Sequence, residues 1–267
     1  MEIIAGNKLC DLSGKTAIVT GAVGIGYGIA YRLAEAGANV MIASLHEAEV
    51  NDVVWKLCEK GWNVKGVTVN VAQEEDVKRM VEETTNVFGG IDILVNNAGI
   101  YPNILFSKMT LADFEKVISV NLTGVFLTTK YVSEKMKEQG RGGKIINITS
   151  IDAIHPSSIG LAHYDSSKHG VWGFTKNVAI ELAEHKIWVN AIAPGGIITE
   201  GVKALQGDAP TVGVDMAKML ESFLAKIPMH RMGEPDEIGK VALFLASDMS
   251  SYMTGEQIVV DGGALLS

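Results

Sequence analysis

The chain of 267 residues contains 47% hydrophobic and 20% charged residues, which is enough apolar material to bury one large core. Its formal net charge of −8 is spread without a basic stripe, so we expect neither nucleic acid nor a membrane as partner. Cys10 and Cys58 are too few for a disulfide framework, and no His, Cys or acidic cluster predicts a metal site. Residues 1–11 lack a signal peptide and no apolar run reaches membrane-spanning length, so a cytoplasmic protein is expected.

Short β-branched runs alternate with segments of helical period along the whole chain. In the first such segment Ile25, Ile29 and Leu33 recur at near-helical spacing, and a helix over about 74–88 begins with acidic residues, as the helix dipole favours. No linker or repeat interrupts the pattern, so residues 1–267 are expected to form one α/β domain, a parallel sheet with helices on both faces. Strands are expected at residues 16–20, 40–43, 64–69, 93–95, 144–148, 188–193 and 257–260.

A glycine-rich turn follows the first expected strand, where residues 20–26 read Thr-Gly-Ala-Val-Gly-Ile-Gly before a helix begins. Glycines such as Gly21, Gly24 and Gly26 let the backbone turn tightly and approach a pyrophosphate, whose charge the helix N-terminus stabilises. Glycine clusters also form plain tight turns. The position between the first strand and first helix of a βαβ unit favours dinucleotide binding here.

Ser44 stands at the end of the second expected strand. In dinucleotide-binding folds an acid at this place holds the ribose 2′-hydroxyl of NAD and repels a 2′-phosphate. A neutral serine tolerates the phosphate, although no arginine supplies a strong bidentate contact. We therefore expect NADP(H) to be preferred, with NAD(H) possible.

Tyr164 is the one tyrosine with a lysine four residues later, Lys168, in a stretch expected to be helical to about residue 184. This spacing places both side chains on one helix face, where the ammonium would favour the phenolate. A free tyrosine has a pKa near ~10, so a cationic neighbour is what a proton donor at neutral pH requires. Taken alone, such a spacing is more often an accidental surface pair than a catalytic one.

Four further motifs accompany that pair: Asn96-Asn97-Ala98-Gly99 after a strand, Asn121 in Val-Asn-Leu-Thr-Gly, Ser150 at a strand end, and Pro194-Gly195. With these motifs and the closing Val-Asp-Gly-Gly, residues 12–263 resemble the short-chain dehydrogenase/reductase family, including its carbonyl reductases, 3-oxoacyl reductases and glucose dehydrogenases. The resemblance implies a Rossmann-type doubly wound sheet and an NAD(P)(H)-dependent enzyme that transfers a hydride between nicotinamide and an alcohol/carbonyl pair. It also implies a homo-oligomer, commonly a tetramer built partly through the helix that carries Tyr164 and Lys168.

The resemblance implies four catalytic residues. Tyr164 would be the acid/base, Lys168 would lower its pKa and hold the nicotinamide ribose, Ser150 would hydrogen-bond the substrate oxygen, and Asn121 would anchor a water that links Lys168 to solvent. The cofactor-binding residues implied are Gly21, Gly24, Ile25, Gly26, Ser44, Asn70, Val71, Asn97, Ala98, Gly99, Tyr164, Lys168, Pro194, Gly195, Ile197 and Thr199.

The chain departs from the family pattern at three places. Only two residues separate Gly21 from Gly24, one fewer than is usual between the first two glycines of the family's loop. We prefer this alignment because it keeps Ile25 and Ile29 on the core face of the helix. Ser150 and Tyr164 are one residue further apart than usual, so the loop between them should bulge. Asn70 stands where an adenine-contacting aspartate is common.

The connection over residues 197–235 mixes Gly, Pro, Met and polar residues and is longer than an ordinary loop. We expect a substrate lid there, in which Met216, Met219 and Phe223 close over a small-molecule substrate of apolar character, unless that face is permanently buried. Alternatives to a carbonyl reductase are a 3-oxoacyl-carrier reductase, a sugar or steroid dehydrogenase, or a non-catalytic dinucleotide-binding protein. A carrier-protein user should show a basic patch near the cleft entrance.

Overall fold

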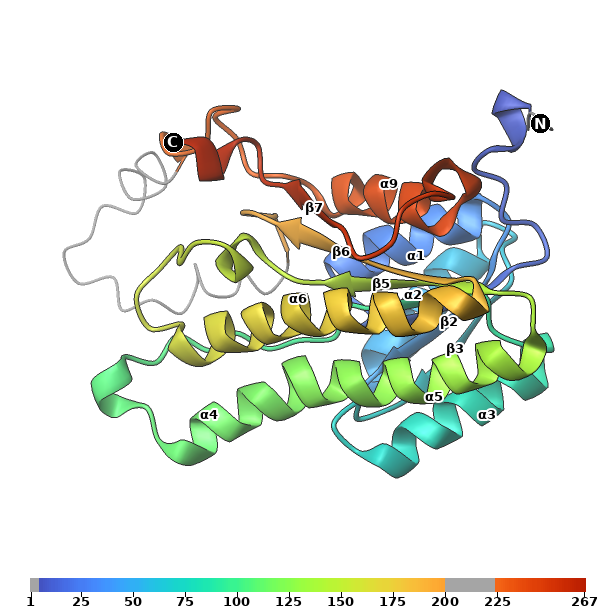
Figure 1. Cartoon of the computed structure of the whole chain (residues 1–267), viewed down its shortest axis with the longest axis horizontal. Coiled ribbons are helices and arrows are strands. Elements are labelled where there is room, and N and C mark those ends of the chain that lie inside the picture. Colours follow the sequence, from blue (N-terminus) through green and yellow to red (C-terminus); the bar gives the residue numbers. More distant parts are fainter. Residues whose placement is uncertain (1–4, 200–223) are drawn as a thin grey trace.

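A parallel sheet forms the centre of the protein, whose computed structural model describes residues 5–199 and 224–267 (Figure 1). Within these residues seven strands are hydrogen-bonded in the order β3-β2-β1-β4-β5-β6-β7. β1 lies near the middle, where Ala17 is in register with Val40 of β2 on one side and Ile93 of β4 on the other. The strands are β1 (Thr16–Thr20), β2 (Asn39–Ser44), β3 (Val64–Thr68), β4 (Ile93–Asn96), β5 (Gly143–Ile148), β6 (Ile187–Pro194) and β7 (Gln257–Val260).

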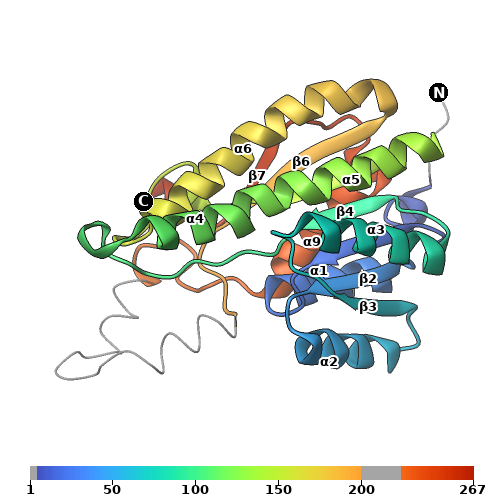
Figure 2. The same ribbon diagram turned by 90° about the horizontal axis from the view of Figure 1, so that it is seen from below.

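Helices cover both faces of this sheet (Figures 1 and 2). On one face lie α1 (Ile25–Glu35), α2 (Glu47–Cys58) and α9 (Pro235–Ala246). On the other face lie α3 (Glu74–Phe88), α5 (Gly124–Gln139) and α6 (Ala162–Leu182), with α4 (Leu111–Ile118) leading into α5. Short helical turns are η1 (Gly6–Lys8), η2 (Phe106–Lys108), η3 (Ser119–Thr123), η4 (Ile151–Ala153), η5 (Ala183–His185), η6 (Asp248–Ser250) and η7 (Ala264–Leu266).

Burial of the sheet on both faces explains why the central strands are almost continuously apolar. Successive side chains of a strand point to opposite faces, so Val19 packs under α1 and α9, while its neighbour Ile18 packs under α3 and α5. The helices add one apolar stripe each, such as Ile29 and Leu33 of α1. The resulting two-sided core fixes the strands, and therefore the loops that leave their carboxyl ends.

The sequence prediction of this architecture is confirmed, including the doubly wound arrangement and all seven strands to within one residue at each end. The main difference at a helix end is that α6 stops at Leu182 and a 3-10 turn, η5, continues to His185. Most of the expected lid, including Met216, Met219 and Phe223, lies outside the described residues. None of the helices in the described part of the chain is long and apolar enough to cross a membrane.

Candidate active site

A cavity of about 1010 Å³ lies at the carboxyl ends of the strands from β3 to β6. A crevice at this edge follows from the fold, because loops diverge there to opposite faces of a parallel sheet. All the sequence-predicted site residues line it except Gly26 and Asn121. The six neighbouring strands span roughly 24 Å at ~4.8 Å per spacing, which suits an extended dinucleotide.

The glycine loop forms the floor of this cavity beside β1. Gly21 has φ 82° and Gly24 has φ 58°, conformations that favour glycine over other residues. A Cβ on Gly26 would lie 1.9 Å from the Gly21 carbonyl oxygen, so the tight turn also requires glycine there. Gly24 immediately precedes α1, and the first-turn amides of α1 have no partners within the helix, which is the geometry that binds phosphate.

The shorter glycine interval keeps the expected side chains in the core. Ile29 is fully buried and Ile25 packs against the same cluster. The glycine turn that precedes α1 is therefore one residue shorter, and the buried face of α1 is unchanged.

The end of the cavity beside β2 carries few charges. Ser44 is buried at the end of β2, and its neighbours in the lining include His46, which is exposed, and Glu49 of α2, which is half-buried. Asn70 also lines this end, but its Oδ1 accepts a 3.1 Å hydrogen bond from the Ala72 amide. Glu49 is a residue that the sequence reasoning missed, because it lies in the first turn of α2 rather than at the strand end.

Asn97 connects β4 to the glycine loop. Its Nδ2 donates to the Thr20 carbonyl at 2.9 Å, and its amide donates to the Thr20 hydroxyl at 3.0 Å. A Cβ on Gly21 would approach that Nδ2 to 2.7 Å, so the two loops touch. Asn97 therefore holds the glycine loop in place, while Ala98 and Gly99 line the cavity beyond it.

Asn121 lies behind the cavity wall, in the π-helical turn η3. Its Oδ1 accepts from the Ile100 amide at 2.8 Å, and its Nδ2 donates to the Ile100 carbonyl at 2.9 Å and to the Ser167 hydroxyl at 3.1 Å. Such turns recur at functional sites because they redirect helix backbone groups. The Asn121 side chain thus ties α6 to the loop after β4, and a Cβ on Gly99 would be 3.3 Å from its Oδ1.

Tyr164 and Lys168 lie together on α6, and Lys168 Nζ is 5.5 Å from the centre of the Tyr164 ring. Nζ donates a 2.8 Å hydrogen bond to the Ile148 carbonyl at the end of β5. Burial lowers the pKa of Lys168 to about 8, and the charge of Asp152 acts in the opposite direction. At pH 7 the Lys168 amine is therefore still mostly ammonium.

The pKa of Tyr164 departs from expectation. Lys168 was expected to lower it, but burial raises the Tyr164 pKa well above its ordinary value, and only a hydrogen bond with Ser150 lowers it. Desolvation penalises the phenolate more than the Ser150 hydrogen bond favours it, and the charges of Asp152 and Asp165 disfavour it further. In this structure Tyr164 is therefore a neutral phenol, the form that donates a proton.

Asp152 is the second residue that the sequence reasoning missed. It lies in η4, lines the cavity, and its Oδ2 accepts a 2.8 Å hydrogen bond from the Ser150 hydroxyl. Its Oδ1 accepts from the Ser157 amide at 2.8 Å and so closes the loop that the longer Ser150–Tyr164 spacing requires. An acid two residues after the strand-end serine was the available signal.

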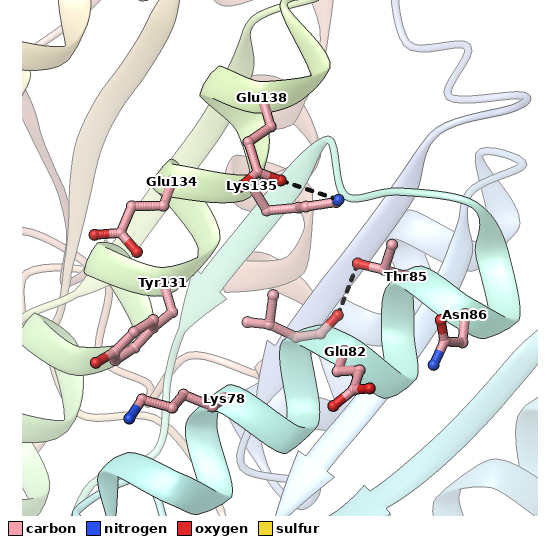
Figure 3. Close-up of a pocket in the computed structure, with 9 residues that line it drawn as sticks. Lys78, Glu82, Thr85, Asn86, Tyr131, Glu134, Lys135 and Glu138 are labelled. Atoms are coloured by element: carbon pink, nitrogen blue, oxygen red, sulfur yellow. Dashed lines mark hydrogen bonds and ion pairs between the residues drawn. The ribbon is translucent and has the colours of Figure 1, made fainter.

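A second, smaller hollow of about 380 Å³ lies between α3 and α5 (Figure 3). Lys135 there pairs with Glu138 at 3.1 Å, and Lys78 pairs with Glu75 at 2.6 Å. It contains none of the predicted site residues, so the cavity at the strand ends is the candidate active site. In residues 5–199 and 224–267 no group of three or more His, Cys, Asp or Glu residues is placed to hold a metal ion.

Comparison with known proteins agrees with this geometry. Residues 21–264 match a family model described as enoyl-(acyl carrier protein) reductase. The 3-oxoacyl-[acyl-carrier-protein] reductase FabG of Aquifex aeolicus is 41% identical over 94% of this chain and 98% of its own length.

Two solved structures show the same fold. A short-chain type dehydrogenase/reductase from Mycobacterium marinum superposes with a TM-score of 0.91 at 39% identity, covering 98% of this chain and 99% of that one. A putative 2-deoxy-D-gluconate 3-dehydrogenase from Agrobacterium tumefaciens with bound NADP has a TM-score of 0.85 at 35% identity, covering 97% and 99%. The chain belongs to the short-chain dehydrogenase/reductase family of oxidoreductases.

Proposed function

We propose that this oxidoreductase uses Tyr164, Lys168, Ser150 and Asn121 to interconvert an alcohol and a carbonyl compound with NADP(H). The observation that carries the proposal is that Ser150, Tyr164 and Lys168 converge in one cavity with the glycine loop. The side chains of Ser150 and Lys168 are almost fully buried there. A protein that only binds a dinucleotide has no need of a proton donor beside a buried amine.

When bound, the nicotinamide supplies or accepts the hydride. In reduction the carbonyl carbon gains this hydride, and its oxygen takes the phenol proton of Tyr164 while Ser150 holds that oxygen. The Lys168 ammonium stabilises the phenolate left behind, which regains its proton from solvent. In oxidation the same residues act in reverse, and the phenolate takes the alcohol proton as the hydride leaves carbon.

The residues at the β2 end fit NADP(H) better than NAD(H), but only modestly. Ser44 stands at the position where an acid would repel a 2′-phosphate, and His46 lines the same end of the cavity. Glu49 lines it too and opposes a second negative charge. The solved relative that holds NADP supports this preference.

The substrate that we propose is a small molecule of apolar character. Among the residues that line the Tyr164 end are Ile100, Tyr101, Leu161 and Met232, which offer an apolar surface. The expected lid over residues 197–235 would complete it, within a single catalytic domain.

A 3-oxoacyl-carrier-protein substrate is the second candidate, favoured by the Aquifex relative. A carrier protein is acidic, so its user should present basic side chains at the entrance. In the described lining the basic side chains are Lys168 and His46, and Lys168 is buried. The free carbonyl compound is therefore the better fit to the described part of the cavity.

We also propose a homo-oligomer, with the tetramer as its expected form. Phe126 of α5 is 44% exposed and Ile180 of α6 is 77% exposed. Phe126 packs edge to face on Phe174 of α6, so α5 and α6 share an apolar outer surface. Such a surface is typical of subunit contacts.

A substrate panel tests the function. Each compound is incubated with NADP(H) or NAD(H) while nicotinamide absorbance is followed. The panel contains cyclohexanone and cyclohexanol, glucose, gluconate, a hydroxysteroid and an acetoacetyl thioester. We expect turnover of an alcohol/carbonyl pair, faster with NADP(H). A protein that binds either cofactor but turns over none of these compounds would be a binding protein, contrary to the proposal.

A further inference from the structure

Asp152 is a buried carboxylate in direct contact with the serine of the site. Its residue is only 5% exposed, and each carboxylate oxygen has a protein donor: the Ser150 hydroxyl on Oδ2 and the Ser157 amide on Oδ1, both at 2.8 Å. The Asp152 amide donates in turn to Ser150 Oγ at 3.1 Å. The Ser150 hydroxyl is therefore held between the backbone and the side chain of the same residue.

Proton counting shows what this arrangement leaves for a ligand. A serine hydroxyl has one proton to donate and two lone pairs that accept. In this structure the proton goes to Asp152 Oδ2 and one lone pair takes the Asp152 amide. The second lone pair faces the cavity, where it accepts the hydrogen bond from the Tyr164 phenol.

We propose that Asp152 is a positioning residue that makes Ser150 a hydrogen-bond acceptor, so that the site binds the alcohol form of its substrate in preference to the carbonyl form. The inference rests on the proposed function, in which Ser150 holds the substrate oxygen. An alcohol can insert between Tyr164 and Ser150, because its oxygen accepts the phenol proton and its own proton goes to the Ser150 lone pair that Tyr164 had occupied. A carbonyl oxygen offers only lone pairs, so it must take the serine proton away from Asp152.

Asp152→Asn reverses this polarity. The amide oxygen of asparagine must face the Ser157 amide, because the opposite orientation would place two donors against each other. The Nδ2 group then faces Ser150 and donates to it, so the hydroxyl proton turns toward the cavity. The variant is nearly isosteric, so the shape of the loop is retained.

Dead-end complexes measure this preference without chemistry. The alcohol form of the best panel substrate is titrated into the enzyme with reduced cofactor, and its carbonyl form into the enzyme with oxidised cofactor, by calorimetry. The ratio of the two dissociation constants should favour the alcohol in the wild type. In Asp152→Asn we expect this ratio to shift by roughly tenfold in favour of carbonyl binding. This is the change in affinity that corresponds to the free energy of one hydrogen bond.

Two controls separate positioning from general effects. Asp165→Asn removes another carboxylate near Tyr164 that has no hydrogen bond to Ser150 in the described structure, and it should leave the ratio unchanged. In a Ser150→Ala background, Asp152→Asn should no longer change the ratio, because the hydroxyl through which it acts is gone.

Ser150→Ala alone should weaken binding of the alcohol form more than binding of the carbonyl form. This test does not require the Asp152 variant to fold. An unchanged ratio in Asp152→Asn, an equal shift in Asp165→Asn, or a shift that persists without the Ser150 hydroxyl would each overturn the inference. The proposed function would fail separately, by absence of wild-type turnover across the panel.

Discussion

The two ends of the active-site cavity differ in the burial and hydrogen bonding of their polar side chains. At the Tyr164 end, Ser150, Asp152 and Lys168 are almost fully buried and hydrogen-bonded to one another or to the end of β5. At the Ser44 end, the polar side chains that could meet a ribose include exposed His46 and half-buried Glu49. Burial shifts pKa values and makes hydrogen bonds costly to break, so the first end is suited to chemistry and the second to selection between cofactors by charge.

Tyr164→Phe should have the largest effect, because it removes the transferable proton from the buried end and almost no volume. We expect turnover to fall by about 10²–10⁴-fold, the usual contribution of a positioned acid or base. Cofactor affinity should stay close to that of the wild type. Steady-state kinetics and cofactor titration check this, and near-normal turnover in the variant would remove Tyr164 from the mechanism.

Lys168→Met tests whether burial of the Lys168 charge lowers the free energy of unfolding. The pKa of Lys168 is about 8 in the folded protein and 10.5 ordinarily, so burial of its charge costs the folded state about 3 kcal/mol at pH 7. This cost is fully present below pH 8 and decreases as pH rises from 8 toward 10.5, because the folded protein has then already released the proton.

We therefore expect Lys168→Met to lower both turnover and cofactor affinity, yet to unfold with a pH dependence that differs from the wild type. Between about pH 7 and 9.5 the wild type should gain about 2 kcal/mol of unfolding free energy relative to the variant. Urea unfolding of both proteins at the two pH values measures this. A difference that does not vary with pH would show that Lys168 is not desolvated.

Substitution of Ser44 by Asp should shift cofactor choice at the other end of the cavity. The new carboxylate can hold the 2′-hydroxyl of NAD and repels the 2′-phosphate, so we expect preference to move toward NADH by about tenfold, or about 1.4 kcal/mol. Glu49→Gln is the matched opposite change and should strengthen NADPH preference. Specificity constants with both cofactors decide it, and a wild type that strongly prefers NADH would contradict the proposed selectivity.

Arg32→Gln should have the smallest effect, because it lies outside the cavity. Arg32 of α1 pairs with Asp236 of α9, and this pair holds the pKa of Asp236 down to about 2. The contribution of the pair is present above the ordinary pKa of Asp236 and is lost as pH falls toward 2. Since Asp236 is 40% exposed, we expect less than about 1 kcal/mol in urea unfolding at pH 7, with turnover unchanged.

Much of the fold could be predicted from the sequence because its signals are local. A short, continuously apolar run such as Ala17–Val19 is typical of a strand buried on both faces, and the glycines after it are typical of a turn. Even the preferred glycine frame followed from the position of Ile29 in α1. These features need no knowledge of what packs against them.

The features that sequence reasoning missed depend on tertiary contacts. The position of Asp152 two residues after Ser150 was a local signal, but the Ser157 amide that fixes its carboxylate comes from further along the loop. The direction of the Tyr164 pKa shift was wrong for a similar reason. Spacing on α6 indicates which charge is near, but only the packed structure shows how strongly the surroundings desolvate the phenol.

Isotope transfer tests whether the hydride passes directly from the alcohol to the cofactor with Tyr164 as the proton acceptor. The preferred alcohol, deuterated at the carbon that bears the hydroxyl, is oxidised with NADP⁺ by the wild type and by Tyr164→Phe. We expect the reduced cofactor formed by the wild type to carry the deuterium, as read by mass spectrometry, and the variant to form almost none. Reduced cofactor without deuterium, or equal formation by both proteins, would contradict direct hydride transfer with Tyr164 as the proton acceptor.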